Sequence, residues 1–208
     1  HTAMLPYLLN HERSGFFEQT KTVFTIHNAA FQGVHSLEKI PFLRHHPHIF
    51  SQVHGGYINM LQTGIECASK VTTVSPNYAD ELLTDLGSHG LHERLVKRKA
   101  DLSGILNGCD YSQWNPATDA YLPENYSVDN LQPKRVCKTT LQTRSGLPEN
   151  AGVPLIGMVC RLTEQKGFGY ILPILDDLVQ HNLQIVIVGT GDPKVCMDLG
   201  EFAQQHPT

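Results

Sequence analysis

Short apolar runs alternate with helical periodicity along the first half of the chain. The runs at 22–26, 70–74 and 103–106 have the length and composition of buried strands. Residues 57–69 carry an apolar side chain at every third or fourth position, which predicts one face of a helix. After the second run, Ser75-Pro76 has the residue types that open a helix, an N-cap followed by proline. This half therefore alternates strand and helix.

The same alternation returns near the C-terminus. Residues 155–160 and 184–188 predict two further buried strands, separated by helical periodicity over 168–180. Pro173 lies inside that helix, so we expect it to be kinked or to start later. Asp192 precedes a proline and predicts the cap of a final helix. Alternation of this kind indicates an α/β protein with doubly wound parallel sheets.

A polar, proline-punctuated segment separates the two alternating regions. It has one predicted helix, over 135–145, and residues 109–133 have the composition of an interdomain connection. We therefore expect one domain over 1–108, a linker over 109–133, and a second domain over 134–208.

Composition limits the kind of partner. Hydrophobic residues make up 40% of the chain, which excludes an intrinsically disordered protein. The formal charge of −4 gives no basic surface for nucleic acid, and no apolar run is long enough to span a membrane. The five cysteines show no Cys-x-x-Cys spacing, which fits reduced thiols in a cytosol. The expected partner is small or neutral.

The strongest candidate for chemistry is the loop Arg161–Gly167, which follows a predicted strand. Ligands of open α/β sheets bind beyond the carboxyl ends of the strands. The cations of Arg161 and Lys166 could converge there on one anion, with a helix N-terminus behind them. Such a group suits a diphosphate held without a metal. The alternative is an exposed loop whose cations meet only water.

Three weaker candidates also follow predicted strands. Gly189 and Gly191 would let a backbone approach a phosphate or sugar closely, or they form a tight turn capped by Asp192. Asn107 could face a cleft between domains, or belong to an Asn-Gly turn. His27 is either a cleft residue or a satisfied structural histidine.

Two other polar runs are interpreted as surface. The histidine-rich run 44–48 contains Pro47 and lacks the spacing of a zinc motif, so we expect a solvated loop and no metal. Lys97-Arg98-Lys99 is expected to form an exposed helix face. The chain has no Walker loop and no Gly-x-Ser-x-Gly elbow.

An ordered set of motifs resembles one family. These motifs are Thr25-Ile-His-Asn-Ala-Ala-Phe-Gln-Gly33, Val71-Thr-Thr-Val-Ser-Pro-Asn-Tyr-Ala79, Gly104-Ile-Leu-Asn-Gly-Cys-Asp110, Trp114-Asn-Pro-Ala-Thr-Asp119, Arg161-Leu-Thr-Glu-Gln-Lys-Gly167 and Gly189-Thr-Gly-Asp192. Together they resemble the ADP-glucose-dependent glycogen and starch synthases, glycosyltransferase family 5. The resemblance covers nearly the whole chain.

The resemblance implies a GT-B fold of two Rossmann-like domains, the acceptor-side domain first and the nucleotide-sugar-binding domain second. It implies retaining transfer of glucose from ADP-glucose to the non-reducing end of an α-1,4-glucan, with no metal and no further cofactor. Arg161 and Lys166 match the pair that binds the donor diphosphate, and His1 resembles an active-site histidine near the transferred sugar. The remaining residues matched to substrate contacts are Asn107, Gln165, His27, Gly189 and Gly191.

The chain also departs from the family pattern. The family's Lys-x-Gly-Gly-Leu loop and its Glu-Pro-Cys-Gly-Leu region are missing, so we expect both domains to be incomplete and the 208 residues alone to be inactive. The alternatives are another GT-B transferase that uses a UDP-sugar, and a non-catalytic remnant that binds glucan or nucleotide. The expected location is the cytoplasm, or a plastid if the source is a plant or alga.

Overall fold

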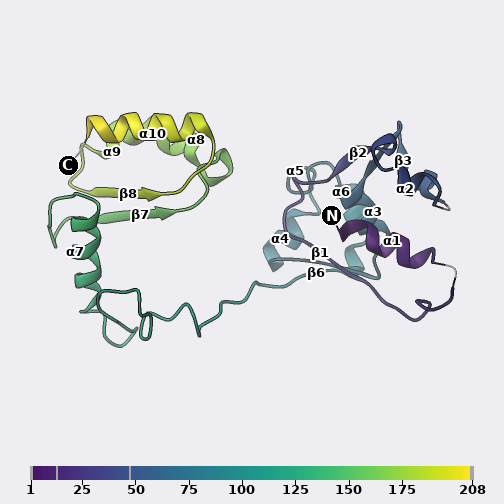
Figure 1. Ribbon diagram of the computed structural model, residues 1–208, viewed down its shortest axis with the longest axis horizontal. Coiled ribbons are helices and arrows are strands. Elements are labelled where there is room, and N and C mark those ends of the chain that lie inside the picture. The colour runs from purple at the N-terminus through teal and green to yellow at the C-terminus, as the bar shows by residue number, and fades with distance from the viewer. Residues whose placement is uncertain (1, 13, 47, 207–208) are drawn as a thin grey trace. The chain divides into compact units, whose positions relative to one another are not determined.

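The computed structural model describes residues 2–12, 14–46 and 48–206. The chain folds into two compact units, His1–Gly108 and Cys109–Thr208, and each is described by itself (Figure 1). Which unit serves the acceptor and which the nucleotide sugar stays a prediction, as does the separate linker over 109–133.

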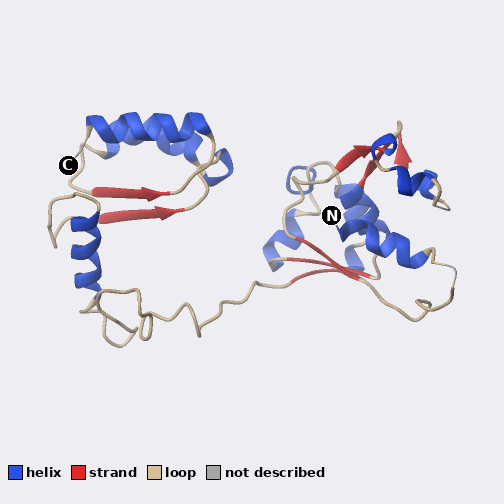
Figure 2. Cartoon of the chain, viewed as in Figure 1, coloured by secondary structure: helices blue, strands red, loops and turns tan. Residues whose placement is uncertain are grey.

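The first unit contains a parallel sheet, a small antiparallel sheet and short helices (Figure 2). Its strands are β1 Val23–Ile26, β2 Val34–Ser36, β3 Val53–His54, β4 Tyr57–Asn59, β5 Lys70–Thr73 and β6 Leu102–Gly104. Its α-helices are α1 Leu5–Asn10, α2 Pro41–Arg44, α3 Met60–Cys67, α4 Pro76–Glu81, α5 Asp85–Ser88 and α6 His92–Lys97. Single turns of 3-10 helix cover Thr2–Met4, Leu37–Lys39, Ile49–Gln52 and Lys99–Asp101.

The parallel sheet confirms the strands expected near 22–26, 70–74 and 103–106. Its order is β1-β5-β6, and Phe24 pairs with Val71 while Val71 pairs with Leu102. The crossover from β1 to β5 contains α3, and the crossover from β5 to β6 contains α4, α5 and α6. Because all three strands run parallel, the loops after Ile26, Thr73 and Gly104 lie at one edge of the sheet.

Local signals place two helix starts. The Ser75 side chain accepts a hydrogen bond from the Tyr78 N–H at 3.0 Å and caps α4, as its sequence predicts. The prediction of one helix over 57–69 is wrong at its start, because residues 57–59 form β4 between β2 and β3. The helix begins only after Asn59, whose side chain accepts from the Gln62 N–H at 3.0 Å.

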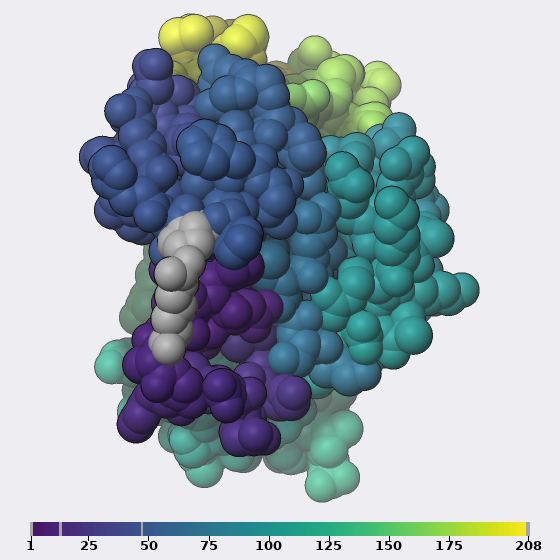
Figure 3. All heavy atoms as spheres, turned by 90° about the vertical axis from the view of Figure 1, so that its right-hand side faces the viewer, coloured from purple at the N-terminus to yellow at the C-terminus, as the bar shows by residue number. Residues whose placement is uncertain are grey.

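Two apolar clusters hold the first unit together. One joins the parallel sheet to α3 and α6 through Phe24, Ile26, Ile65, Val71 and Leu95, among others. The other joins α1 to the segment 37–58 and contains Tyr7, which is fully buried. Figure 3 shows this second region as a lobe of dark blue residues beside the purple N-terminal segment.

Arg98 does not lie on an exposed surface, which corrects the expectation for Lys97-Arg98-Lys99. Its guanidinium donates to the carbonyls of Ile65 at 2.8 Å and Ala68 at 2.7 Å, and also to Asp101 at 3.1 Å. Further bonds reach the Glu66 and Ser69 carbonyls. Those carbonyls belong to the C-terminal end of α3 and the residues after it, so Arg98 satisfies groups that the helix itself leaves unpaired.

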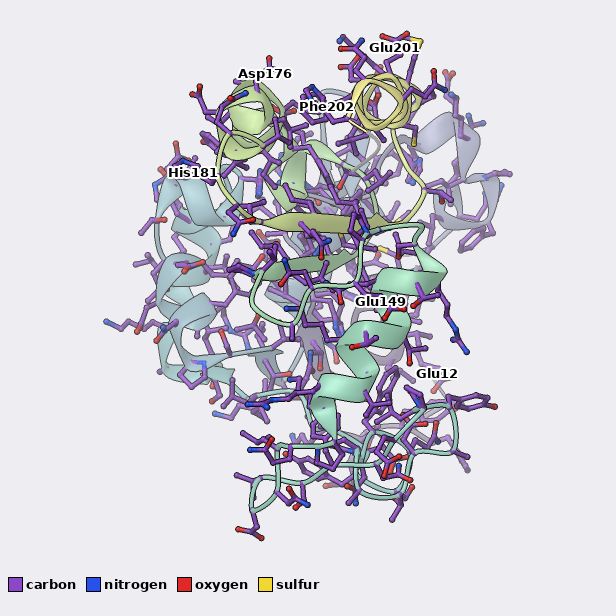
Figure 4. All side chains as sticks on the ribbon, turned by 90° about the vertical axis from the view of Figure 1, so that its left-hand side faces the viewer. Glu12, Glu149, Asp176, His181, Glu201 and Phe202 are labelled. Atoms are coloured by element: carbon purple, nitrogen blue, oxygen red, sulfur yellow. The ribbon has the colours of Figure 1, made fainter. Side chains whose placement is uncertain are left out.

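The second unit contains a two-stranded parallel sheet with helices on both faces. Its elements are α7 Lys134–Arg144, β7 Leu155–Val159, α8 Phe168–Ile171, α9 Leu175–Leu178, β8 Gln184–Val188 and α10 Pro193–Gln205, with 3-10 turns at Glu164–Lys166 and Leu172–Ile174. Helices α8, α9 and α10 cover one face and α7 lies on the other (Figures 1 and 4). Figure 4 also shows Phe202 on the side of α10 that faces α9, and Glu201 pointing away from the sheet. Parallel α/β structure is thus confirmed in both units.

Several local predictions for this unit are confirmed and one is wrong. Strand β8 has the expected bounds, and Asp192 caps α10 by accepting from the Lys194 N–H at 2.8 Å. The helix over 168–180 is interrupted around Pro173, as expected. The strand over 155–160 is not buried, since Ile156 is 42% and Val159 85% exposed. Among the strands that the structure describes, β7 pairs with β8 along one edge only.

A buried amide pair links α7 to β8. The Gln142 amide donates to the Gln184 side-chain oxygen at 2.6 Å and to the Asn150 carbonyl at 3.1 Å. The Gln184 amide donates to the Pro148 carbonyl at 2.8 Å. Because both side chains are buried, these partners remove most of the cost of burying two amides.

Candidate active site

Two loops meet at the carboxyl end of the β7–β8 sheet. The Leu162 N–H donates to the Thr190 carbonyl at 2.9 Å, and the Asp192 N–H donates to the Leu162 carbonyl at 2.7 Å. These bonds form a parallel bridge between Leu162 and Gly191, so the sheet continues beyond its named strands. The two loops that the sequence singled out therefore lie side by side.

Both glycines of the second loop are required by this contact. A Cβ on Gly191 would overlap the Leu162 carbonyl oxygen, and a Cβ on Gly189 would overlap the Cys160 carbonyl oxygen. Asp192 caps the next helix, as the turn interpretation expected. At these glycines the backbone of the second loop thus lies directly against the backbone of residues 160–162. Contact with a phosphate or sugar stays a prediction for both.

Arg161 and Lys166 flank the buried residue Leu162 and remain exposed. Among the residues that the structure describes, neither side chain forms an ion pair or a hydrogen bond. Lys166 ends the 3-10 turn Glu164–Lys166, and Gly167 then adopts a φ of 85° that favours glycine. Both cations, and the amide of Gln165 between them, are therefore free to meet a ligand.

The helix expected behind these cations is present but short. The helix there, α8, has only four residues and begins at Phe168. The Lys166 N–H donates to Thr163 and the Gly167 N–H to Glu164, both at 2.9 Å. These two N–H groups are used within the loop and do not add to the side-chain charge of Arg161 and Lys166.

The first unit has its own hollow, of about 620 Å³, beside the end of β1. Its buried lining residues are apolar, whereas the exposed ones, which form its rim, are polar apart from Phe31 and Gly33. It is lined by Thr2, Ala3, Phe24, Thr25, Ile26, His27, Asn28, Phe31, Gln32, Gly33, His35, Met60 and Leu61. His27 is exposed at this rim, which supports a cleft position rather than a buried structural one. His1 lies outside the described residues.

Asn107 lies on the same sheet edge as His27. It is exposed and follows β6, whereas His27 follows β1. Three residues later in the chain and within the second unit, Asp110 accepts hydrogen bonds from the Ser112 hydroxyl at 2.6 Å and the Ser112 N–H at 3.0 Å. These bonds lower the pKa of the Asp110 carboxyl from its usual value. Of the predicted site residues, His27 and Asn107 thus belong to the first unit and the other described ones to the second.

Phe31, His35 and Met60 also line the hollow of the first unit, although the sequence did not single them out as site residues. The available signal is Gly33, whose φ of 65° marks the turn that brings His35 back beside the end of β1. From the sequence, a glycine at position 33 predicts a loop but not which residues that loop brings to the hollow.

The histidine-rich run is partly packed rather than solvated. His46 is half-buried, with its Nδ1 3.2 Å from the hydroxyl of buried Tyr7, and its ring lies edge-on to that of His11, with the ring centroids 6.0 Å apart. Pro47 lies outside the described residues. Within the described part of the chain, no group of three or more His, Cys, Asp or Glu side chains is arranged to hold a metal ion. None of the described helices is both long and apolar enough to cross a membrane.

Parallel sheets with helices on their faces and loop sites at the strand ends define the class, an α/β fold of the doubly wound type. Residues 1–97 match the starch synthase catalytic domain family. The glycogen synthase of Aeromonas salmonicida is 50% identical to this chain over 100% of its length. The glycogen synthase of Vibrio cholerae is 51% identical over 99% of it. The chain is thus similar to glycogen synthases along nearly its whole length, and its first 97 residues match the catalytic domain of starch synthases.

A solved structure of a starch synthase is also similar to this chain. The catalytic domain of starch synthase IV from Arabidopsis thaliana, bound to ADP and acarbose, matches 98% of this chain with a TM-score of 0.86 and 29% identity. The chain spans less than half the length of these relatives, 43% of the Aeromonas protein and 43% of the Arabidopsis chain.

Proposed function

We propose that the protein containing this chain is a retaining glucosyltransferase of glycogen or starch synthesis. It transfers glucose from ADP-glucose to the non-reducing end of an α-1,4-glucan. The similarity to glycogen synthases supports this proposal, and so do the ADP and acarbose bound in the Arabidopsis structure. ADP-glucose is a substrate, so the proposed reaction needs no resident cofactor. We expect the reaction to take place in the cytoplasm.

The observation that carries the proposal concerns the Arg161–Gly167 loop, which the Leu162–Gly191 bridge joins to the second loop. Its two cations, Arg161 and Lys166, have no ion-pair or hydrogen-bond partner among the described residues. When the bond between glucose C1 and the diphosphate oxygen breaks, negative charge grows on the departing ADP. Arg161 and Lys166 would stabilise that charge, because fixed cations aimed at developing charge are a large term in catalysis. The acceptor hydroxyl forms the new bond to C1, and its proton passes to the departing diphosphate.

The other predicted residues take supporting roles in this proposal. Gln165, Gly189 and Gly191 belong to the donor edge of the second unit. His27 and Asn107 belong to the sheet edge of the first unit, where the hollow of about 620 Å³ would receive sugar. His1 is assigned to the same sugar by its resemblance to the family motif.

The test is incorporation of radiolabelled glucose into glycogen from ADP-glucose by the full-length protein. Arg161→Ala should reduce kcat by at least about 100-fold, equivalent to about 3 kcal/mol of transition-state stabilisation. Arg144→Ala is the matched control, because Arg144 is also exposed in the second unit but lies at the end of α7. A near-normal rate for Arg161→Ala would contradict the role assigned to Arg161.

We also propose that the 208 residues alone give little or no transfer, since they span 43% of the Aeromonas relative. The same assay on the isolated chain checks this. Robust turnover by the chain alone would refute it without affecting the proposed reaction.

A further inference from the structure

The loop that follows β1 supplies much of the hollow in the first unit. His27, Asn28, Phe31, Gln32 and Gly33 all line it. A loop offers little rigidity of its own, so a site built on it needs contacts that fix its backbone.

The far end of this loop is fixed by the Gln32 side chain. Its oxygen accepts from the Asn59 amide at 2.5 Å, and its own amide donates to the His89 carbonyl at 2.8 Å. The Gln32 carbonyl also accepts from the Leu61 N–H at 3.0 Å. Gln32 is thus bound to the start of α3 and to the residue after α5.

The Asn28 side chain accepts from the Ala30 N–H at 2.9 Å within the middle of the loop, and one side chain from outside the loop also binds there. The Tyr78 hydroxyl, on α4, accepts a hydrogen bond from the Ala29 N–H at 3.0 Å. Ala29 is fully buried, so water cannot readily replace this partner. Tyr78 is therefore the group that holds the backbone directly after His27 and Asn28.

We propose that Tyr78 is a positioning residue for the transfer reaction: its hydroxyl holds the Ala29 backbone and thereby sets His27 and Asn28 at the rim of the hollow. This inference rests on the proposed function, since it concerns the sugar that the hollow would receive. Tyr78 itself does not line the hollow. It acts through the loop and not by touching substrate.

Tyr78→Phe removes only the hydroxyl and keeps the ring that packs against the core. We expect kcat to fall between about 10- and 100-fold, because small displacements of positioned groups have effects of that size. The KM for ADP-glucose should change less than twofold, since the residues assigned to the diphosphate belong to the second unit. Hydrogen exchange in the peptide 25–33 should become faster.

Ser69→Ala provides a matched control at the other end of the same strand pair. The Ser69 hydroxyl accepts from the Thr22 N–H, also at 3.0 Å, before β1 begins. This variant also leaves a backbone N–H without its side-chain partner, but far along β1 from His27. It should lower the melting temperature and leave both kcat and the exchange of 25–33 close to wild type.

The outcomes distinguish the positioning role of Tyr78 from the proposed transfer reaction. Slow transfer with fast exchange in Tyr78→Phe, and neither in Ser69→Ala, supports the positioning role. A wild-type kcat in Tyr78→Phe overturns it, as does an equal loss of kcat in Ser69→Ala. If the wild-type protein transfers no glucose from ADP-glucose, the proposed function fails, and the positioning role fails with it.

Discussion

Leu162 and Gly191 lie in direct backbone contact, although neither belongs to a named strand. The Asp192 N–H donates to the Leu162 carbonyl at 2.7 Å, and no side chain fits between the two residues. This contact extends the β7–β8 sheet by one pair and brings the Arg161–Gly167 loop against the Gly189–Asp192 loop. The proposed donor site therefore depends on a glycine that itself needs no contact with the donor.

Gly191→Ala should destabilise the second unit. Its Cβ would overlap the Leu162 carbonyl oxygen, so the two loops must separate, at a cost of about 1–3 kcal/mol. Gly200→Ala is the control, because Gly200 lies within α10 with open space around it. Alanine there should stabilise the helix by about 1 kcal/mol. Thermal unfolding of both variants measures this, and an equal melting temperature would contradict the contact.

Arg98→Ala should destabilise the first unit more than Lys99→Ala. Removing the guanidinium leaves several carbonyls at the end of α3 without a donor, and hydrogen bonds to charged groups contribute about 1.5–3 kcal/mol. Lys99 is an exposed neighbour of the same charge. Urea unfolding of the two variants gives the difference. Similar midpoints would show that these carbonyls find other partners.

Stability should also depend on Asp101 in acid. The hydrogen bond from Lys70 at 2.7 Å, followed by the contact with Arg98, lowers the pKa of Asp101 in the folded state. A lowered pKa adds stability above the unfolded value of about 3.9, and that stability is lost as the pH falls through the folded pKa. The melting temperature of wild type should therefore drop more steeply below about pH 4 than that of Asp101→Asn or Lys70→Met. Parallel curves for all three proteins would argue against this linkage.

Local signals predicted the parts of the fold that depend on neighbours in sequence. The Ser75 cap, the Asp192 cap and the bounds of β8 all follow from short-range chemistry. The strand at 57–59 was missed because its pairing with β2 and β3 involves distant residues, while Ile58 also fits helical spacing. Arg98 was misplaced for the same reason, since its partners lie about 30 residues earlier.

The candidate site was predicted in part. Motif positions after strands correctly brought together the two loops of the second unit, because parallel strands end at one edge. The roles of Tyr78 and Gln32 could not be predicted, since each depends on a hydrogen bond to a residue 49 or 57 positions away. The spacing of residues along the sequence does not predict hydrogen bonds between positions so far apart.

The most direct test of the central claim is calorimetric titration of ADP into the full-length protein. Wild type and Arg144→Ala should bind ADP with similar affinity, and UDP more weakly. Arg161→Ala and Lys166→Ala should each bind ADP at least about 10-fold more weakly, the change expected when a charge-assisted contact to phosphate is lost. The account is contradicted if wild type shows no ADP binding, or if both variants bind ADP as tightly as wild type.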